Sequence, residues 1–185
     1  MVDPATTSFL SVTTTVAAKE SVITIRDYRP QDAEVVNEIT RLAWEQFRDH
    51  FPDFNTFIAE SSKMSTLTET CELLLAKMDD KIVGVVGYGP PHRPKQPCFN
   101  PAWAVIRMLS THPEARGHGV GRLLIGECIR RAERDRAAVL ALTTTTINEV
   151  ALKMYLRMGF RFESDAPPVA STPAGLYLML LKENR

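Results

Sequence analysis

The sequence predicts an α/β domain built around a mixed β-sheet, and three features of its patterning support this. Segments 71–78 and 82–88 have the composition of β-strands and are separated by only three residues, which is typical of an antiparallel hairpin. In the second half of the chain, strand-like and helix-like segments alternate, which favours parallel pairing. Segment 138–143 is almost wholly apolar, as expected of a strand covered on both faces.

The elements before the hairpin follow from local patterns. Segment 21–27 alternates apolar and polar residues and predicts the first strand. Pro30 and Asp32 indicate a helix start, with Asp32 as the candidate cap, and apolar residues at helical spacing extend this helix to about residue 47. A short second helix is predicted within 48–64.

The remaining elements are punctuated by glycine and proline. Segment 90–101 contains five prolines and is expected to be an irregular loop, and Gly159 is a natural helix C-cap. In order, we expect a strand at 103–110, a helix at 120–132, the apolar strand at 138–143, a helix at 148–158, a strand from 160, a Pro-rich loop at 166–174 and a last strand at 176–182.

Composition limits the class of protein. The chain has 185 residues, 44% hydrophobic and 24% charged, which suits one globular domain at 21–185 preceded by a tail or arm at 1–20. Its 22 basic residues balance 22 acidic ones, which argues against a general nucleic-acid binder. No apolar run approaches ~18 residues, so we expect no membrane span. Residues 1–20 make a poor secretory signal.

Cysteine and histidine usage points to a reducing compartment and to no metal site. The three cysteines, Cys71, Cys98 and Cys128, are an odd number without CxxC spacing, which fits neither a disulfide framework nor a cysteine-based zinc site. The four histidines form no HxxxH pair. We therefore expect a cytoplasmic protein without a bound metal.

A glycine-rich turn joins the strand at 103–110 to the helix at 120–132. A strand, a glycine turn and a helix N-terminus together form an anion site, because backbone N–H groups and the helix dipole point at the ligand. A P-loop would need a Lys and a Ser or Thr after Gly121, and a dinucleotide fingerprint would need GxGxxG. The pattern R/QxxGxG/A is met by Arg116, Gly119 and Gly121. A glycine turn without any ligand is the remaining alternative.

Two ordered motifs resemble the GNAT N-acetyltransferase superfamily over about 21–185. LSTHPEARGHGVGRLL is similar to its acetyl-CoA loop, and NEVALKMYLRMGF is similar to the helix that follows. The resemblance implies acetyl-CoA as cosubstrate. It also implies a mixed, mostly antiparallel sheet with flanking helices, whose two central parallel strands splay apart to form the cleft.

The resemblance assigns roles by position. It implies that main-chain groups of Leu109, Ser110 and Thr111 hold the acetyl-pantetheine arm, that Asn148 contacts that arm, and that Tyr155 protonates the leaving thiolate. It implies that the pyrophosphate loop comprises Gly117, His118, Gly119, Val120, Gly121 and Arg122, and that Arg116, which opens the R/QxxGxG/A pattern, also binds the cofactor.

Plainer structural roles remain open for the same residues. Tyr155 could be a core aromatic, Asn148 an N-cap and His118 a solvated side chain. Arginines of the helix at 120–132 and just beyond could meet the nucleotide phosphates or could simply form its wet face; they are Arg122, Arg130, Arg131 and Arg134.

The acceptor side of the predicted cleft is less defined. Neither central strand contains a carboxylate, and Arg107 is the only ionisable residue of the first. The Pro-rich loop at 90–101 could wall the acceptor pocket. Candidates for a general base elsewhere are Asp49, His50, Asp53, Glu69 and Glu72, each of which could equally be a surface charge.

The expected function is N-acetyl transfer from acetyl-CoA to a primary amine, on a small molecule or peptide, by direct attack. No cysteine lies in either motif beside a plausible base, which disfavours a covalent acyl-enzyme. An α-amine is favoured over a Lys side chain, because its lower pKa makes the neutral form easier to present. The alternative is a non-catalytic acetyl-CoA-binding regulatory module. No nucleic-acid or membrane partner is expected, and a homodimer stays open.

Overall fold

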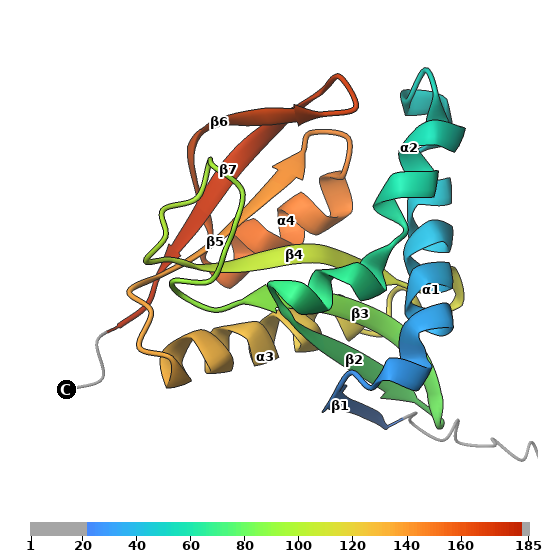
Figure 1. Cartoon of the computed structure of the whole chain (residues 1–185), viewed down its shortest axis with the longest axis horizontal. Coiled ribbons are helices and arrows are strands. Elements are labelled where there is room, and N and C mark those ends of the chain that lie inside the picture. Colours follow the sequence, from blue (N-terminus) through green and yellow to red (C-terminus); the bar gives the residue numbers. More distant parts are fainter. Residues whose placement is uncertain (1–21, 183–185) are drawn as a thin grey trace, which may run out of the picture.

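The computed structural model describes residues 22–182, so the prediction of a tail at 1–20 lies outside the described residues. The described chain forms one seven-stranded sheet in the order β1-β2-β3-β4-β5-β7-β6 (Figure 1). All neighbouring strands are antiparallel except β4 and β5. The strands are β1 (Ile23–Asp27), β2 (Glu72–Met78), β3 (Lys81–Gly89), β4 (Ala104–Thr111), β5 (Val139–Thr145), β6 (Arg161–Val169) and β7 (Thr172–Leu180).

Helices cover both faces of the sheet. They are α1 (Ala33–Glu45), α2 (Phe54–Ser61), α3 (Val120–Arg134) and α4 (Glu149–Met158). The alternation of β2 shows the two layers, because Leu73 and Leu75 pack with α1, whereas Leu74 packs with α3. None of the helices in the described part of the chain is long and apolar enough to cross a membrane. The expected mixed, mostly antiparallel sheet with flanking helices is thus confirmed.

The first helix begins differently from the prediction. A 3₁₀ turn at Pro30–Asp32 precedes α1, and the Asp32 carboxylate makes no capping bond to that helix. It accepts instead from the Arg29 backbone N–H at 2.8 Å and pairs with Arg26 at 2.7 Å. These bonds hold the pKa of Asp32 below its usual range, chiefly through the hydrogen bond from Arg26. Asp32 therefore fastens the turn to β1.

The Pro-rich loop predicted at 166–174 is wrong. These residues instead form most of a β-hairpin, in which β6 continues to Val169 and a two-residue turn at Ala170 and Ser171 leads into β7. Pro167 and Pro168 are tolerated because β6 is an edge strand, where a missing N–H need not interrupt a ladder, and Pro173 is the second residue of β7, directly after the turn. The pairing also shifts register between Ala166 and Val169, which places Pro167 and Pro168 in the irregular part.

Candidate functional site

The two parallel strands separate directly beyond their point of contact. β4 pairs with β5 only at Ala104 and Val105, whereas β5 stays paired with β7 over its whole length. The implied splay of the central strands is therefore confirmed, and Figure 1 shows β4 and β5 diverging. Beyond Val105, main-chain N–H and C=O groups on that side of β4 have no strand partner and are free to bind a ligand.

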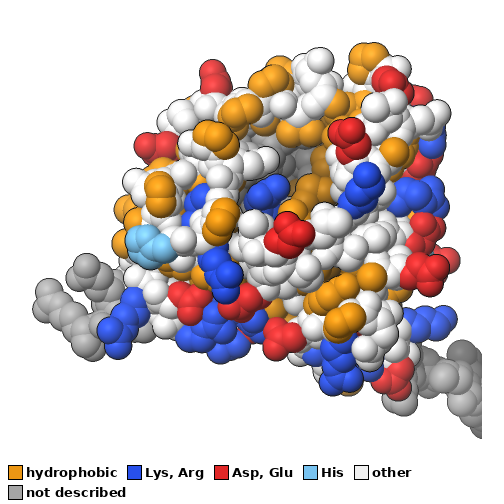
Figure 2. Space-filling view, viewed as in Figure 1, with side chains coloured by type: hydrophobic (Ala, Val, Ile, Leu, Met, Phe, Trp, Pro, Cys, Tyr) orange, Lys and Arg blue, Asp and Glu red, His pale blue; other side chains and the backbone are white. Residues whose placement is uncertain are grey.

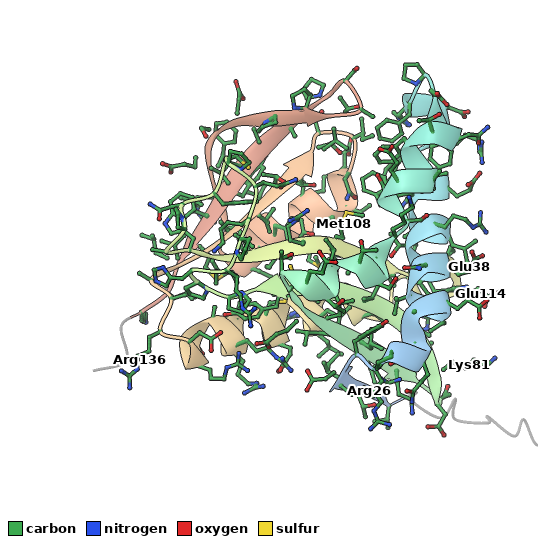
Figure 3. The ribbon with its side chains drawn as sticks, in the orientation of Figure 1. Arg26, Glu38, Lys81, Met108, Glu114 and Arg136 are labelled. Carbon is green, nitrogen blue, oxygen red and sulfur yellow. The ribbon has the colours of Figure 1, made fainter. Side chains whose placement is uncertain are left out.

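A bulge interrupts β4 where the strands have parted. Met108 has φ +53°, and the pairing between β3 and β4 shifts at this point. Figure 3 shows Met108 at β4, near the centre of the view. A bulge re-aims the main chain and the side chains beside it. Leu109 and Thr111 follow the bulge and line a cavity, whereas the Ser110 side chain is buried and contributes none of the lining.

The glycine-rich turn leads into the N-terminus of α3. Gly117 (φ +81°) and Gly119 (φ +79°) both adopt the left-handed conformation that favours glycine, and nothing lies within 4 Å of where a Cβ would stand. The first intrahelical bond runs from the Leu123 N–H to the Gly119 carbonyl at 3.0 Å. The N–H groups of 120–122 consequently face outward, as in an anion site.

A cavity of about 390 Å³ opens over this turn, and we call it the loop cavity. All of the cofactor-binding residues expected from the sequence line it except Ser110 and His118. His118 is exposed, and its Nδ1 lies 3.0 Å from the Arg116 carbonyl oxygen. The sequence did not point to the opposite wall, formed by Trp44 and Phe47 at the end of α1, because nothing local connects that helix to the turn.

A second cavity, of about 380 Å³, lies between the separated strands, and we call it the strand cavity. Figure 2 shows this face hollowed between the β6–β7 hairpin and α2. Its floor includes Arg107 and Met108 of β4 and Thr143 to Thr145 of β5. Trp44, Leu109 and Asn148 line both cavities, so the two adjoin. Asn148 holds the N-cap position of α4 but makes no capping bond with its side chain.

Tyr155 projects from α4 to the strand cavity. Its side chain is 5% exposed and its ring meets Phe160 edge-on at 5.8 Å, so it is also part of the core. Burial raises the pKa of the Tyr155 phenol, which therefore stays protonated at neutral pH. The Tyr155 oxygen has no hydrogen-bond partner in 22–182. It is nevertheless not fully buried, because among the described side chains the Glu45 carboxylate alone has a fully buried polar atom without a partner. The Tyr155 oxygen is therefore accessible from the cavity.

The arginines near the end of α3 do not face either cavity. Arg131 pairs with Asp27, Glu72 and Glu127, and Arg134 pairs with Glu72 and Asp135. Arg130 pairs with Glu127 at 2.6 Å. Arg131 and Arg134 tie α3 to β1 and β2, which favours a structural role for both, whereas Arg130 lies on the exposed face of α3. Arg122, in the first turn of α3, lines the loop cavity.

The carboxylates and the histidine considered as bases also lie elsewhere. Glu72 is engaged by Arg131 and Arg134, and Asp53 accepts from the Thr56 N–H at 3.1 Å as the cap of α2. Asp49, His50 and Glu69 line neither cavity. Within 22–182, the carboxylate that does line the strand cavity is Glu60, on the exposed side of α2. Its sequence context, FNTFIAES, gave no signal of this position.

Residues 36–160 match the family model described as the acetyltransferase (GNAT) family. The chain is 26% identical to N-alpha-acetyltransferase 30 of Saccharomyces cerevisiae over 129 residues, which is 70% of this chain and 64% of that protein. The chain thus spans less than two thirds of that relative's length.

Solved structures show the same fold at low identity. PaiA N-acetyltransferase from Thermoplasma acidophilum in complex with coenzyme A aligns with a TM-score of 0.71 and 19% identity, covering 86% of this chain and 99% of the other. YncA from Salmonella typhimurium, determined with its cofactor acetyl-CoA, gives a TM-score of 0.62 and 18% identity, covering 88% and 95%. With the family model matched over most of its length, the chain belongs to the acetyltransferase (GNAT) family.

Proposed function

We propose that this protein transfers the acetyl group of acetyl-CoA to a primary amine. The observation that carries the proposal is the continuity of the two cavities, which runs from the α3 N-terminus, past the unpaired edge of β4, to the Tyr155 side chain. That path offers an anion site, a row of free main-chain groups and a proton donor in the order that the parts of acetyl-CoA require.

The residues present fit the cosubstrate. Gly117 and Gly119 leave open space for a phosphate to approach the backbone, and the N–H groups of 120–122 point at that space. The unpaired edge of β4 beyond Val105 can bond an extended amide chain as a strand would. The aromatic side chains Trp44 and Phe47 add apolar surface to the lining of the loop cavity.

Tyr155 suits the role of proton donor to a departing thiolate. Its phenol is neutral because burial raises its pKa, and the same burial disfavours a charged thiolate beside it. A proton can then pass from the Tyr155 oxygen to the departing sulfur; the attacking nitrogen loses a proton to solvent as the amide forms, and the phenol recovers one from solvent. The proposed attack by the amine is direct, because Cys71, Cys98 and Cys128 line neither cavity, and burial raises the pKa of each thiol.

The proposed acceptor is an α-amine rather than a Lys side chain. Presenting a Lys amine neutral at pH 7 costs about 4–5 kcal/mol, whereas the α-amine of a peptide costs about 1 kcal/mol. The lining of the strand cavity supplies Glu60 as its carboxylate, at the rim, so a strong base is not built into the floor. We further propose a cytoplasmic location, which suits the three unpaired cysteines.

The test is transfer of acetyl from acetyl-CoA to α-amines and ε-amines of matched size. The rate is measured by the release of the CoA thiol. Preference for α-amines in kcat/KM supports the full proposal. Preference for ε-amines with a base titrating near pH 6–7 would keep the transferase and reject the α-amine. Tight CoA binding without transfer to any amine would favour the alternative, a regulatory acetyl-CoA-binding module.

A further inference from the structure

Arg107 is unusual among the arginines of this protein. Among the arginines described in 22–182, those that are not exposed are Arg26, Arg41, Arg107 and Arg131. Arg26, Arg41 and Arg131 are each held by a carboxylate. The Arg107 guanidinium makes no ion pair and no hydrogen bond with any residue of 22–182, although its backbone pairs with β3. Withdrawing a guanidinium from water is costly unless its charge finds a partner, so the missing partner requires an explanation.

The position of Arg107 places the charge in the strand cavity. It immediately precedes the bulge at Met108 and lines the cavity floor. β3 approaches Arg107 closely at Gly87, where an added Cβ would stand 3.3 Å from the Arg107 Cβ. This close packing helps to fix the position of the Arg107 side chain. Cys71 and Cys98 lie near enough for the Arg107 charge to lower the pKa of each thiol slightly against the larger effect of burial, which raises it.

The other charges of the cavity do not neutralise Arg107. Its lining contains a second cation, Lys63, and one carboxylate, Glu60, both on exposed side chains at the α2 end. Lys95 also lies close to Cys71, but its ammonium donates to the carbonyls of Pro90 and Pro101, at 3.2 and 3.0 Å. Figure 2 shows basic side chains at the hollow of this face. The floor of the strand cavity is therefore a site for an anion.

We propose that the amine acceptor carries a carboxylate, which Arg107 binds while the amine reaches the thioester. This inference rests on the proposed function and deepens it. A guanidinium holds a carboxylate through two parallel N–H···O bonds, which fixes orientation as well as position. The carboxylate of a free amino acid raises the pKa of the neighbouring amine, and its pairing with Arg107 offsets part of that effect.

The size and lining of the cavity favour a small acceptor. It is about 380 Å³ in volume and is bounded by α2, by β4 and β5, and by Val169 at the end of β6. Its wall between Trp44 and Phe57, whose rings lie 5.1 Å apart, is apolar and aromatic. A free α-amino acid with an apolar side chain fits the volume of the cavity, its apolar wall and the unpaired charge of Arg107. A peptide whose first residue is acidic would present the same carboxylate chemistry from another source.

The test compares acceptors with and without the anionic group, with kcat/KM expressed for the neutral amine of each, because a carboxylate raises the pKa of the neighbouring amine. Leucine, methionine and phenylalanine are measured against their amides, and short peptides beginning with Glu against the same peptides beginning with Gln. We expect a higher kcat/KM for at least one acid over its neutral partner by ~10-fold or more, the range of a charge-assisted hydrogen bond. Preference among free amino acids or among peptides identifies the source of the carboxylate.

Variants assign the preference to Arg107. Arg107→Gln should lower kcat/KM for the acid by roughly 10- to 100-fold and leave the amide unchanged, whereas Arg107→Lys should recover part of the loss. Arg93→Gln, the same change at an exposed arginine that lines neither cavity, should match the wild type. Thermal melting checks that each variant is folded.

The opposing outcomes are distinct. Equal use of acids and amides by the wild type, or an equal loss for both in Arg107→Gln, rejects the carboxylate and leaves the transferase intact. Loss of the preference in Lys63→Gln but not in Arg107→Gln rejects Arg107 as the anion site. Transfer to no amine at all rejects this inference together with the proposed function.

Discussion

Replacing Gly119 with Glu should abolish CoA binding without unfolding the protein. Gly119 has φ +79°, so any L-residue there strains the backbone by about 1–2 kcal/mol. Nothing lies within 4 Å of the new Cβ, so no clash adds to that strain. The new carboxylate would stand at the α3 N-terminus, where the pyrophosphate is proposed to bind. Two unit charges about 5 Å apart at an effective dielectric near 20 repel by roughly 3 kcal/mol.

That repulsion predicts a loss of CoA affinity of roughly 100-fold or more. Gly119→Lys imposes the same backbone strain with the opposite charge, so it should bind CoA within about 10-fold of wild type. Gly126→Glu adds the same charge to an exposed position on α3 outside both cavities and should bind normally. Titration calorimetry with CoA and thermal melting measure these effects. A folded Gly119→Glu variant whose affinity stays within about 3-fold of wild type would refute the assignment of the loop.

Further predictions concern the proton donor, the buried ion pairs and the pH profile. Tyr155→Phe should lower kcat by roughly 10²–10⁴ with CoA affinity nearly unchanged, whereas a purely structural Tyr155 would leave turnover intact and lower only the melting temperature. Hydrogen bonds from Arg130, above all, and from Arg131 hold the pKa of Glu127 at about 2. Glu127→Gln should therefore cost up to about 3 kcal/mol in urea unfolding at neutral pH. That difference should shrink as the pH falls from about 4.5 through about 2; a pH-independent difference would contradict it. The described cavity linings contain no histidine, so kcat/KM should rise with pH up to the pKa of the acceptor amine, and a plateau already at pH 6 would contradict this.

Local sequence patterns predicted the elements well where one rule acted alone. The β2–β3 hairpin, the amphipathic α3 and the C-cap at Gly159 each follow from spacing or from one special residue, and the structure contains all of them. The β6–β7 hairpin was missed because two rules conflict there. Proline normally breaks a strand, and only the place of β6 at the sheet edge, which the sequence does not reveal, removes that penalty.

Some residues of the candidate site could be predicted from local sequence patterns, and others could not. The residues of the glycine turn are contiguous, so one motif brings them to the loop cavity together. The partners of Arg131 are not contiguous, since Asp27 and Glu72 reach it across 104 and 59 residues of chain. Sequence spacing could not separate such an arginine from one that faces a ligand. The walls formed by Trp44 and Glu60 depend equally on how α1 and α2 pack, and no local pattern encodes that packing.

β4 connects the cofactor and acceptor sides of the site. Its pairing with β5 at Ala104 and Val105 anchors it in the sheet, and the end of that pairing frees its main chain. The bulge at Met108 then changes which side chains face the cleft, so that Arg107 lies on the floor of the strand cavity and Leu109 borders both cavities. Because these neighbours lie on one short segment of a single strand, a bound acceptor carboxylate and a bound acetyl-pantetheine arm would be held in fixed relation to each other. Such fixed relation is the condition for direct attack without a covalent intermediate, since the reacting atoms must meet within one bound complex.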